Sequence, residues 1–320
     1  MTYGNIGLPL LQASRIAFGT AVEPMTTGKN ADALLDGAAE RGINLFDCAR
    51  SYGRAEEVLG EWIRRRRNRE QVIVLTKCGD IRYGVVKVNR QVILEQLETS
   101  LKILQTDYID IFLLHRDDPK TPLREIMETL QEVKREGRIR LFGVSNWTAE
   151  RIREANRLAE QNQTGNLSVS SPNYGLALQM DDLWGGGCVS IAGPEHRTDR
   201  DWYARTQMPV VAYSSLGRGF FSGKFRSDDP EGAKRVLDSF AQKGYLYPEN
   251  MERLKRAEEL AQRKGLTVPE IAMRYVFASP MNLFAVVSTT KPERLDDSIK
   301  AASDPLAAEE AKWLEGENNG

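Results

Sequence analysis

The sequence predicts an α/β fold, a (β/α)8 TIM barrel that residues 1–320 form as a single domain. Short apolar runs alternate with longer amphipathic segments, and eight such units fit a chain of 320 residues, a length compatible with one barrel. The first run ends at Phe18-Gly19-Thr20, without the GxGxxG turn that usually follows the first strand of a doubly wound open sheet. The open sheet is therefore the less favoured alternative.

The expected strands are short apolar runs, whereas the expected helices repeat apolar residues at helical spacing. The run 108–114 is almost wholly apolar, as a parallel strand covered on both faces should be. Thr148 and Gly137 are the candidate N-cap and C-cap of two helices. The strands are expected at 15–19, 44–47, 72–76, 108–114, 141–144, 167–170, 210–213 and 284–287. The helices are expected at 31–41, 55–66, 89–104, 123–135, 149–161, 250–264, 268–278 and 292–302.

Two long segments, 179–200 and 219–247, interrupt the regular alternation after the sixth and seventh strands. In a barrel they would lie over the C-terminal mouth, where loops carry function, although ordinary surface loops are the alternative. Their aromatic content favours a binding role. The aromatic residues expected to line a substrate pocket are Tyr83, Trp147, Trp184, Trp202 and Phe220.

Composition excludes several classes of protein. Hydrophobic residues make up 41% of the chain and its net charge is −1, which argues against a dedicated nucleic-acid binder. The basic run at 64–67 and 69 follows an apolar stripe and is expected to be a solvated helix end rather than a phosphate patch. No signal sequence and no apolar run of about 20 residues is present, so neither secretion nor a membrane span is expected.

The three cysteines, Cys48, Cys78 and Cys188, are an odd number without CxxC spacing. They indicate a reduced, cytoplasmic protein without disulfides and without a metal site. A homo-oligomer is left open by the sequence.

Four ionisable residues fall at or just beyond three successive strand ends: Asp47, Tyr52, Lys77 and His115. Each has a structural alternative, namely a helix cap, a rim aromatic, an exposed lysine or a core histidine. Because the strand ends of a barrel converge on one mouth, we expect the four side chains to meet there.

These four residues suit the reduction of a carbonyl. Tyrosine has a pKa near about 10, which is high for a proton donor at neutral pH. A nearby ammonium is expected to lower the pKa of Tyr52, with Asp47 keeping Lys77 charged. His115 could hydrogen-bond a substrate oxygen. The hydride for such a reaction must come from a cofactor.

Along nearly its whole length the sequence resembles the aldo-keto reductases. The matching stretches are 44–47 (NLFD), 51–53 (SYG), 74–77 (VLTK), 110–115 (DIFLLH), 143–146 (GVSN) and 213–217 (YSSLG). One such motif is weakly specific, but all of them in the same order are highly specific.

The resemblance implies a role for each matching position. Tyr52 would be the general acid in reduction and the base in oxidation, tuned by Lys77 and Asp47, while His115 would orient a carbonyl or alcohol substrate. The residues that would hold the cofactor are Ser145, Asn146, Ser171, Tyr213, Ser214, Leu216, Gly217, Thr289, Arg294 and Asp297.

The stretch 287–294 (VSTTKPER) matches the family's segment for an adenosine 2′-phosphate, so Arg294 favours NADP(H) over NAD(H). Two positions depart from the family's pattern. Ser171 stands where a glutamine usually holds the carboxamide, and Asp297-Ser298 stands where the family commonly has a Glu-Asn pair.

Two other functions compete with an enzyme of this family. A cofactor-binding, redox-sensing regulatory subunit would resemble the potassium-channel β-subunits, although an intact set of four reactive residues argues against it. A metal-dependent barrel hydrolase has little support, because the two histidines show neither HxH nor HExxH spacing.

Overall fold

The computed structural model describes residues 1–80 and 87–316, and its centre is a closed barrel of parallel strands. The strands follow one another around the barrel in chain order, and β10 (Leu283–Val287) closes it between β9 (Val210–Ala212) and β3 (Ile16–Gly19). The other strands are β4 (Leu45–Asp47), β5 (Ile73–Cys78), β6 (Ile109–Leu114), β7 (Ile139–Ser145) and β8 (Val169–Ser171). The predicted (β/α)8 barrel is confirmed.

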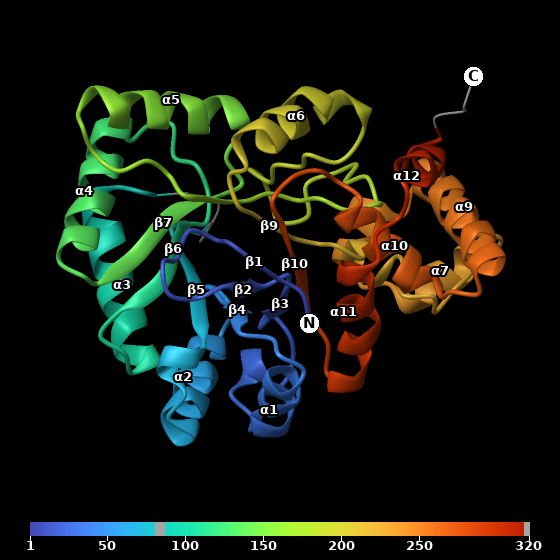
Figure 1. The fold of residues 1–320 in the computed structure, drawn as a ribbon, viewed down its shortest axis with the longest axis horizontal. Coiled ribbons are helices and arrows are strands. Elements are labelled where there is room, and N and C mark those ends of the chain that lie inside the picture. Colours follow the sequence, from blue (N-terminus) through green and yellow to red (C-terminus); the bar gives the residue numbers. More distant parts are fainter. Residues whose placement is uncertain (81–86, 317–320) are drawn as a thin grey trace.

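Helices surround the strands, with α7, α9 and α12 outside this ring beside α10 (Figure 1). The ring contains α1 (Asp32–Glu40), α2 (Ala55–Arg66), α3 (Arg90–Leu104), α4 (Leu123–Arg135), α5 (Ala149–Gln161), α6 (Arg197–Thr206), α10 (Val268–Phe277) and α11 (Leu295–Ser303). The outer helices are α7 (Pro230–Val236), α8 (Ser239–Tyr245), α9 (Pro248–Lys264) and α12 (Ala308–Glu315).

The predicted helix caps are found where the sequence indicated. The Thr148 side chain accepts a hydrogen bond from the Arg151 N–H at 3.2 Å and begins α5. Gly137 follows α4 with a φ of +77°, a left-handed conformation that glycine adopts without a steric penalty. These local signals therefore set both helix ends.

A short N-terminal hairpin, for which the sequence predicted no structure, closes one end of the barrel. It pairs β1 (Tyr3–Gly4) with β2 (Ala13–Ser14), and it lies in front of the strands in Figure 1. Ile6 and Leu8 are buried in the same apolar cluster as barrel-interior side chains such as Ile111. This end is therefore sealed by apolar contacts, and polar side chains gather at the opposite, C-terminal end.

The long segments after β8 and β9 contain helices that the sequence analysis missed. In α6, only Tyr203 is buried, and the helix is otherwise polar. Both α7 and α8 have only 7 residues each. Neither a wide apolar stripe nor sufficient length marked these helices in the sequence.

The basic run ends α2, as predicted, and two of its arginines pair with acidic residues of α1. Arg65 lies 2.5 Å from Asp32, and Arg66 lies 2.5 Å from Asp36. The three cysteines are free, and the described residues contain no cluster able to hold a metal ion. Within the described chain, no helix combines the length and apolar character needed to cross a bilayer.

Candidate active site

The strand ends β4 and β5 bring Asp47, Lys77 and Tyr52 together. The Lys77 ammonium donates to Asp47 Oδ1 at 2.6 Å and to the Cys48 carbonyl oxygen at 2.9 Å. Its Nζ also lies 3.4 Å from the Tyr52 hydroxyl oxygen, which accepts from it. Asp47 and Lys77 are both buried, and Tyr52 is partly buried. The attraction between the two charges offsets part of their desolvation.

Burial and charge set the protonation states of this group. Burial raises the pKa of Tyr52 to about 12, although the Lys77 ammonium opposes that shift. The expected lowering of the Tyr52 pKa is therefore wrong, because the loss of water outweighs the neighbouring cation. Burial also opposes the charge on Lys77, but attraction to Asp47 and Tyr52 prevails and raises the pKa of Lys77. The phenol is thus protonated at neutral pH and faces a fixed cation.

His115 follows β6 and lies beside Tyr52. The two rings are 5.9 Å apart between centroids, at an interplanar angle of 78°. His115 Nδ1 lies 3.5 Å from Ser51 Oγ and 3.8 Å from Asp80, whereas Nε2 has no hydrogen-bond partner among the described residues. Burial, followed by repulsion from Lys77, lowers the pKa of His115 to about 3. The imidazole is therefore neutral at physiological pH.

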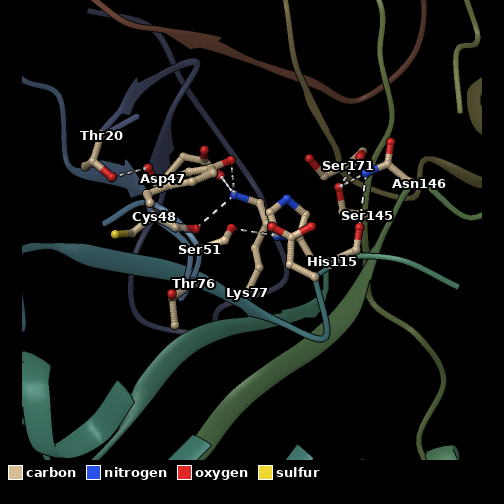
Figure 2. Close-up of polar contacts among 12 residues, drawn as sticks. Thr20, Asp47, Cys48, Ser51, Thr76, Lys77, His115, Ser145, Asn146 and Ser171 are labelled. Atoms are coloured by element: carbon tan, nitrogen blue, oxygen red, sulfur yellow. Dashed lines mark hydrogen bonds and ion pairs between the residues drawn. The ribbon is translucent and has the colours of Figure 1, made fainter. Parts of the chain in front are cut away.

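A second polar group lies across His115 from Asp47 and Lys77 (Figure 2). Ser145 Oγ donates to the Ser171 carbonyl oxygen at 2.8 Å. Asn146 Nδ2 donates to Ser145 Oγ at 3.0 Å and to the His115 carbonyl oxygen at 3.1 Å. Asn146 has a φ of +60°, and the Tyr213 hydroxyl donates to its Oδ1. These contacts link the ends of β6, β7, β8 and β9 into one rigid wall.

Both polar groups open into a single cleft of about 1270 Å³ at the C-terminal mouth. The cleft extends from Tyr52 and His115 to the segment after β10. Thirteen of the fourteen predicted site residues lie on its wall: Asp47, Tyr52, Lys77, His115, Ser145, Asn146, Ser171, Tyr213, Ser214, Leu216, Thr289, Arg294 and Asp297. Gly217, the remaining one, is buried, and its N–H donates to the Ser214 carbonyl oxygen at 2.7 Å.

Residues 15–318 match the sequence profile of the Aldo/keto reductase family. The chain belongs to this family. Among its relatives is the aldo-keto reductase YhdN of Bacillus subtilis (strain 168), which is 30% identical over 98% of this chain and 92% of its own length. The aldo-keto reductase str7 of Strobilurus tenacellus is 28% identical over 87% of this chain and 77% of its own length.

A probable voltage-gated potassium channel subunit beta of Oryza sativa subsp. japonica is 26% identical over 94% of this chain and 91% of its own length. The matches therefore include proteins named as reductases and one named as a channel subunit. Membership of the family supports an oxidoreductase that acts on small-molecule carbonyl compounds.

The aromatic wall of this reductase differs from the expectation. Trp184 lines the cleft, as predicted. Trp147 and Phe220 are buried in the apolar core, and Trp202 packs against Tyr203 with ring centroids 4.7 Å apart, so these three do not line it. Tyr83 lies outside the described residues.

Sequence reasoning also missed cationic residues of the cleft wall. Arg116, directly after His115, and Arg218, in the loop after β9, both lie on this wall. The position of Arg116 next to His115 at a strand end was the one signal that could have singled it out.

Proposed function

We propose that this reductase reduces an aldehyde or ketone with NADPH, or oxidises the corresponding alcohol, with Tyr52 as the general acid or base. The observation that carries the proposal is the position of the Lys77 ammonium between Asp47 and the Tyr52 oxygen, at 2.6 and 3.4 Å, on the wall of a large cleft. Because the phenol oxygen accepts from Lys77, its own hydrogen is available to a substrate oxygen.

Proton transfer from Tyr52 follows from these contacts. At neutral pH the phenol is protonated, since its pKa is raised to about 12 by burial. When a carbonyl oxygen gains negative charge, the phenol donates its proton, and the Lys77 ammonium stabilises the phenolate that forms. In alcohol oxidation the phenolate accepts the proton instead.

His115 would orient the carbonyl beside Tyr52. Its pKa of about 3 keeps the ring neutral, so it acts by hydrogen bonding and not as a cation. With Nδ1 next to Ser51, Nε2 is the ring nitrogen left for the substrate oxygen.

The donor set of the cleft fits a nicotinamide dinucleotide, which supplies or accepts the hydride when bound. The amide and hydroxyl groups of Asn146 and Ser145 would hold the carboxamide, and the Tyr213 ring would stack on the nicotinamide. The Ser171 carbonyl oxygen accepts from Ser145 Oγ at 2.8 Å and so holds that hydroxyl in the wall. Gly219 also lines the cleft. A Cβ added at Gly219 would meet no atom within 4 Å, so the cleft is open beside this part of the backbone and a cofactor could approach it.

Arg294 favours NADP(H) over NAD(H). Its side chain lies on the cleft wall beside Thr289 and Asp297, is exposed, and forms no ion pair with any described carboxylate. A guanidinium without a partner can form two parallel hydrogen bonds with the 2′-phosphate of NADP(H).

The deciding experiment measures NADPH consumption with a panel of aldehydes. We expect wild-type protein to turn over at least one aldehyde, and Tyr52→Phe to bind NADPH with similar affinity but lose on the order of 10²- to 10⁴-fold in kcat. Full turnover by Tyr52→Phe would refute the mechanism.

A cofactor-binding regulatory subunit is the second candidate, favoured by the rice relative named as a channel subunit. That function predicts tight NADPH binding with negligible turnover on every aldehyde tested. The buried Asp47–Lys77 pair lies beside Tyr52, where the ammonium would stabilise the phenolate that forms on proton donation. A regulatory subunit has less need of such a proton donor, so this arrangement favours the enzyme.

A further inference from the structure

The wall of the cleft contains a buried arginine that has no counterion among the residues the structure describes. Arg116 is 4% exposed, and its Nη1 donates to the His115 carbonyl oxygen at 3.0 Å. Its Nη2 approaches Cys188 Sγ at 3.8 Å, a weak contact, and its Nε has no hydrogen-bond partner. A guanidinium carries five N–H donors, so most of those on Arg116 are not used by the described residues.

The other buried cation of this wall, Lys77, is paired with a carboxylate. Lys77 forms its ion pair with Asp47 at 2.6 Å, whereas Arg116 forms no ion pair with any described carboxylate. Asp80 lies on the same wall, but it approaches His115 Nδ1 at 3.8 Å and is not within ion-pair distance of Arg116. An uncompensated buried charge is costly to the fold, so its retention requires a reason.

Trp184 lies near both Arg116 and a second arginine, Arg218. The guanidinium carbon of Arg116 is 6.0 Å from the Trp184 ring centroid, and that of Arg218 is 5.7 Å from it. Arg218 is paired with Asp238 at 2.7 Å, so the charge of Arg218 is compensated. The available positive charge next to the aromatic wall therefore belongs to Arg116.

The loop that carries Trp184 is fixed by one carboxylate. Asp182 accepts hydrogen bonds from the N–H groups of Trp184, Gly186 and Cys188 at 2.9, 2.9 and 2.8 Å. The loop thus places the indole and the Cys188 thiol against Arg116 without providing an anion for it. Among the described residues no carboxylate takes the place of a partner for Arg116, so its free N–H donors are available to an anionic ligand in the cleft.

We infer that Arg116 binds an anionic group of the substrate, and that the preferred substrates are aldehydes or ketones that also carry a carboxylate. This inference rests on the proposed function. Arg116 directly follows His115, so a carbonyl held at His115 and Tyr52 could carry its carboxylate to the guanidinium. A planar carboxylate matches the guanidinium fork, and the low dielectric of the buried wall strengthens that contact.

The test compares each oxo acid with its uncharged methyl ester. We expect wild-type protein to show a higher kcat/KM for 4-carboxybenzaldehyde and 4-oxobutanoate than for methyl 4-formylbenzoate and methyl 4-oxobutanoate. In Arg116→Gln this preference should fall on the order of ten- to a hundredfold, mainly through KM. Arg116→Lys keeps the charge without the fork and should retain part of the preference.

Arg218→Gln is the matched control, because Arg218 faces the same indole but is already paired with Asp238. We expect its acid-to-ester ratio to stay near the wild-type value. Equal loss on acids and esters in Arg116→Gln would indicate a merely structural role and overturn the inference. So would a wild-type protein that shows no preference for the acids.

A binding measurement separates this inference from the proposed function. Terephthalate, which has no aldehyde to reduce, should bind wild-type protein more tightly than Arg116→Gln in calorimetry with NADP⁺ present. Turnover of esters and acids alike, without terephthalate binding, overturns the role of Arg116 and leaves the reductase proposal intact. Terephthalate binding that depends on Arg116, without turnover of any aldehyde, supports the anion site and refutes the reductase.

Discussion

The two ends of the cleft differ in how their charges are arranged. Around Tyr52, the charged pair Lys77 and Asp47 is buried, with 2.6 Å between Nζ and Oδ1. At the far end, Arg294 is exposed and has no ion-pair partner among the described carboxylates. One end is organised before any ligand binds, and the other leaves a cation in water.

The difference follows from what each end must do. A proton donor works best when its hydrogen-bonding neighbours are already positioned, so that no reorganisation accompanies the reaction. A cation that binds a phosphate is better left solvated, because a permanent partner would compete with the phosphate. Arg116 is buried and has no counterion in residues 1–80 and 87–316, and this combination is what assigns it to an anionic ligand.

The largest effect is expected from breaking the buried pair. In Lys77→Met, Asp47 remains buried without its partner, and we expect the free energy of unfolding to fall by about 3–5 kcal/mol. Urea denaturation should show a lower midpoint at unchanged m value. The double variant Asp47→Asn with Lys77→Met should recover part of the loss.

The exposed pair Arg90–Glu132, at 2.5 Å, provides the matched control. Arg90→Met should shift the midpoint far less, since water screens that pair. If Lys77→Met and Arg90→Met lowered the urea midpoint by the same amount, the contrast between buried and exposed charges would be contradicted.

At the exposed end, the expected effect is on cofactor choice. Arg294→Gln should weaken NADPH binding on the order of ten- to a hundredfold, because a charged hydrogen-bond partner of the 2′-phosphate is lost. NADH binding should change little. Fluorescence titration with both cofactors measures this, and Lys300→Gln, in helix α11 that begins directly after Arg294, is the control. Parallel weakening of NADPH and NADH would argue against a 2′-phosphate contact.

The smallest effect is expected from pH. Reduction requires protonated Tyr52, which holds below its pKa of about 12, and neutral His115, which holds above its pKa of about 3. For an uncharged aldehyde, kcat/KM should therefore be nearly constant between about pH 5 and pH 9. A pH series with methyl 4-formylbenzoate tests this. An ionisation near pH 6.5 that disappears in His115→Gln would show that the imidazole titrates as in water.

Much of the fold could be predicted because its signals are local. Helices α2, α4 and α5 begin and end at the predicted residues. Their apolar spacing, the Thr148 cap of α5 and Gly137 after α4 are signals that act within about one helical turn. The hairpin β1–β2 was missed, because its role depends on contacts of Ile6 and Leu8 with distant strands. Helix α6 was missed because it buries a single side chain, Tyr203.

The sequence by itself determined which residues reach the mouth, because a parallel barrel brings every strand's carboxyl end to one edge. Asp47, Lys77 and His115 followed from that rule. Only the tertiary structure decided how these groups ionise, since burial outweighs Lys77 at Tyr52. It also decided that Trp147 is buried in the core and that Arg116 has no carboxylate partner within the described part of the chain. Spacing along the chain reflects local geometry, whereas desolvation and charge pairing depend on residues brought together from distant segments.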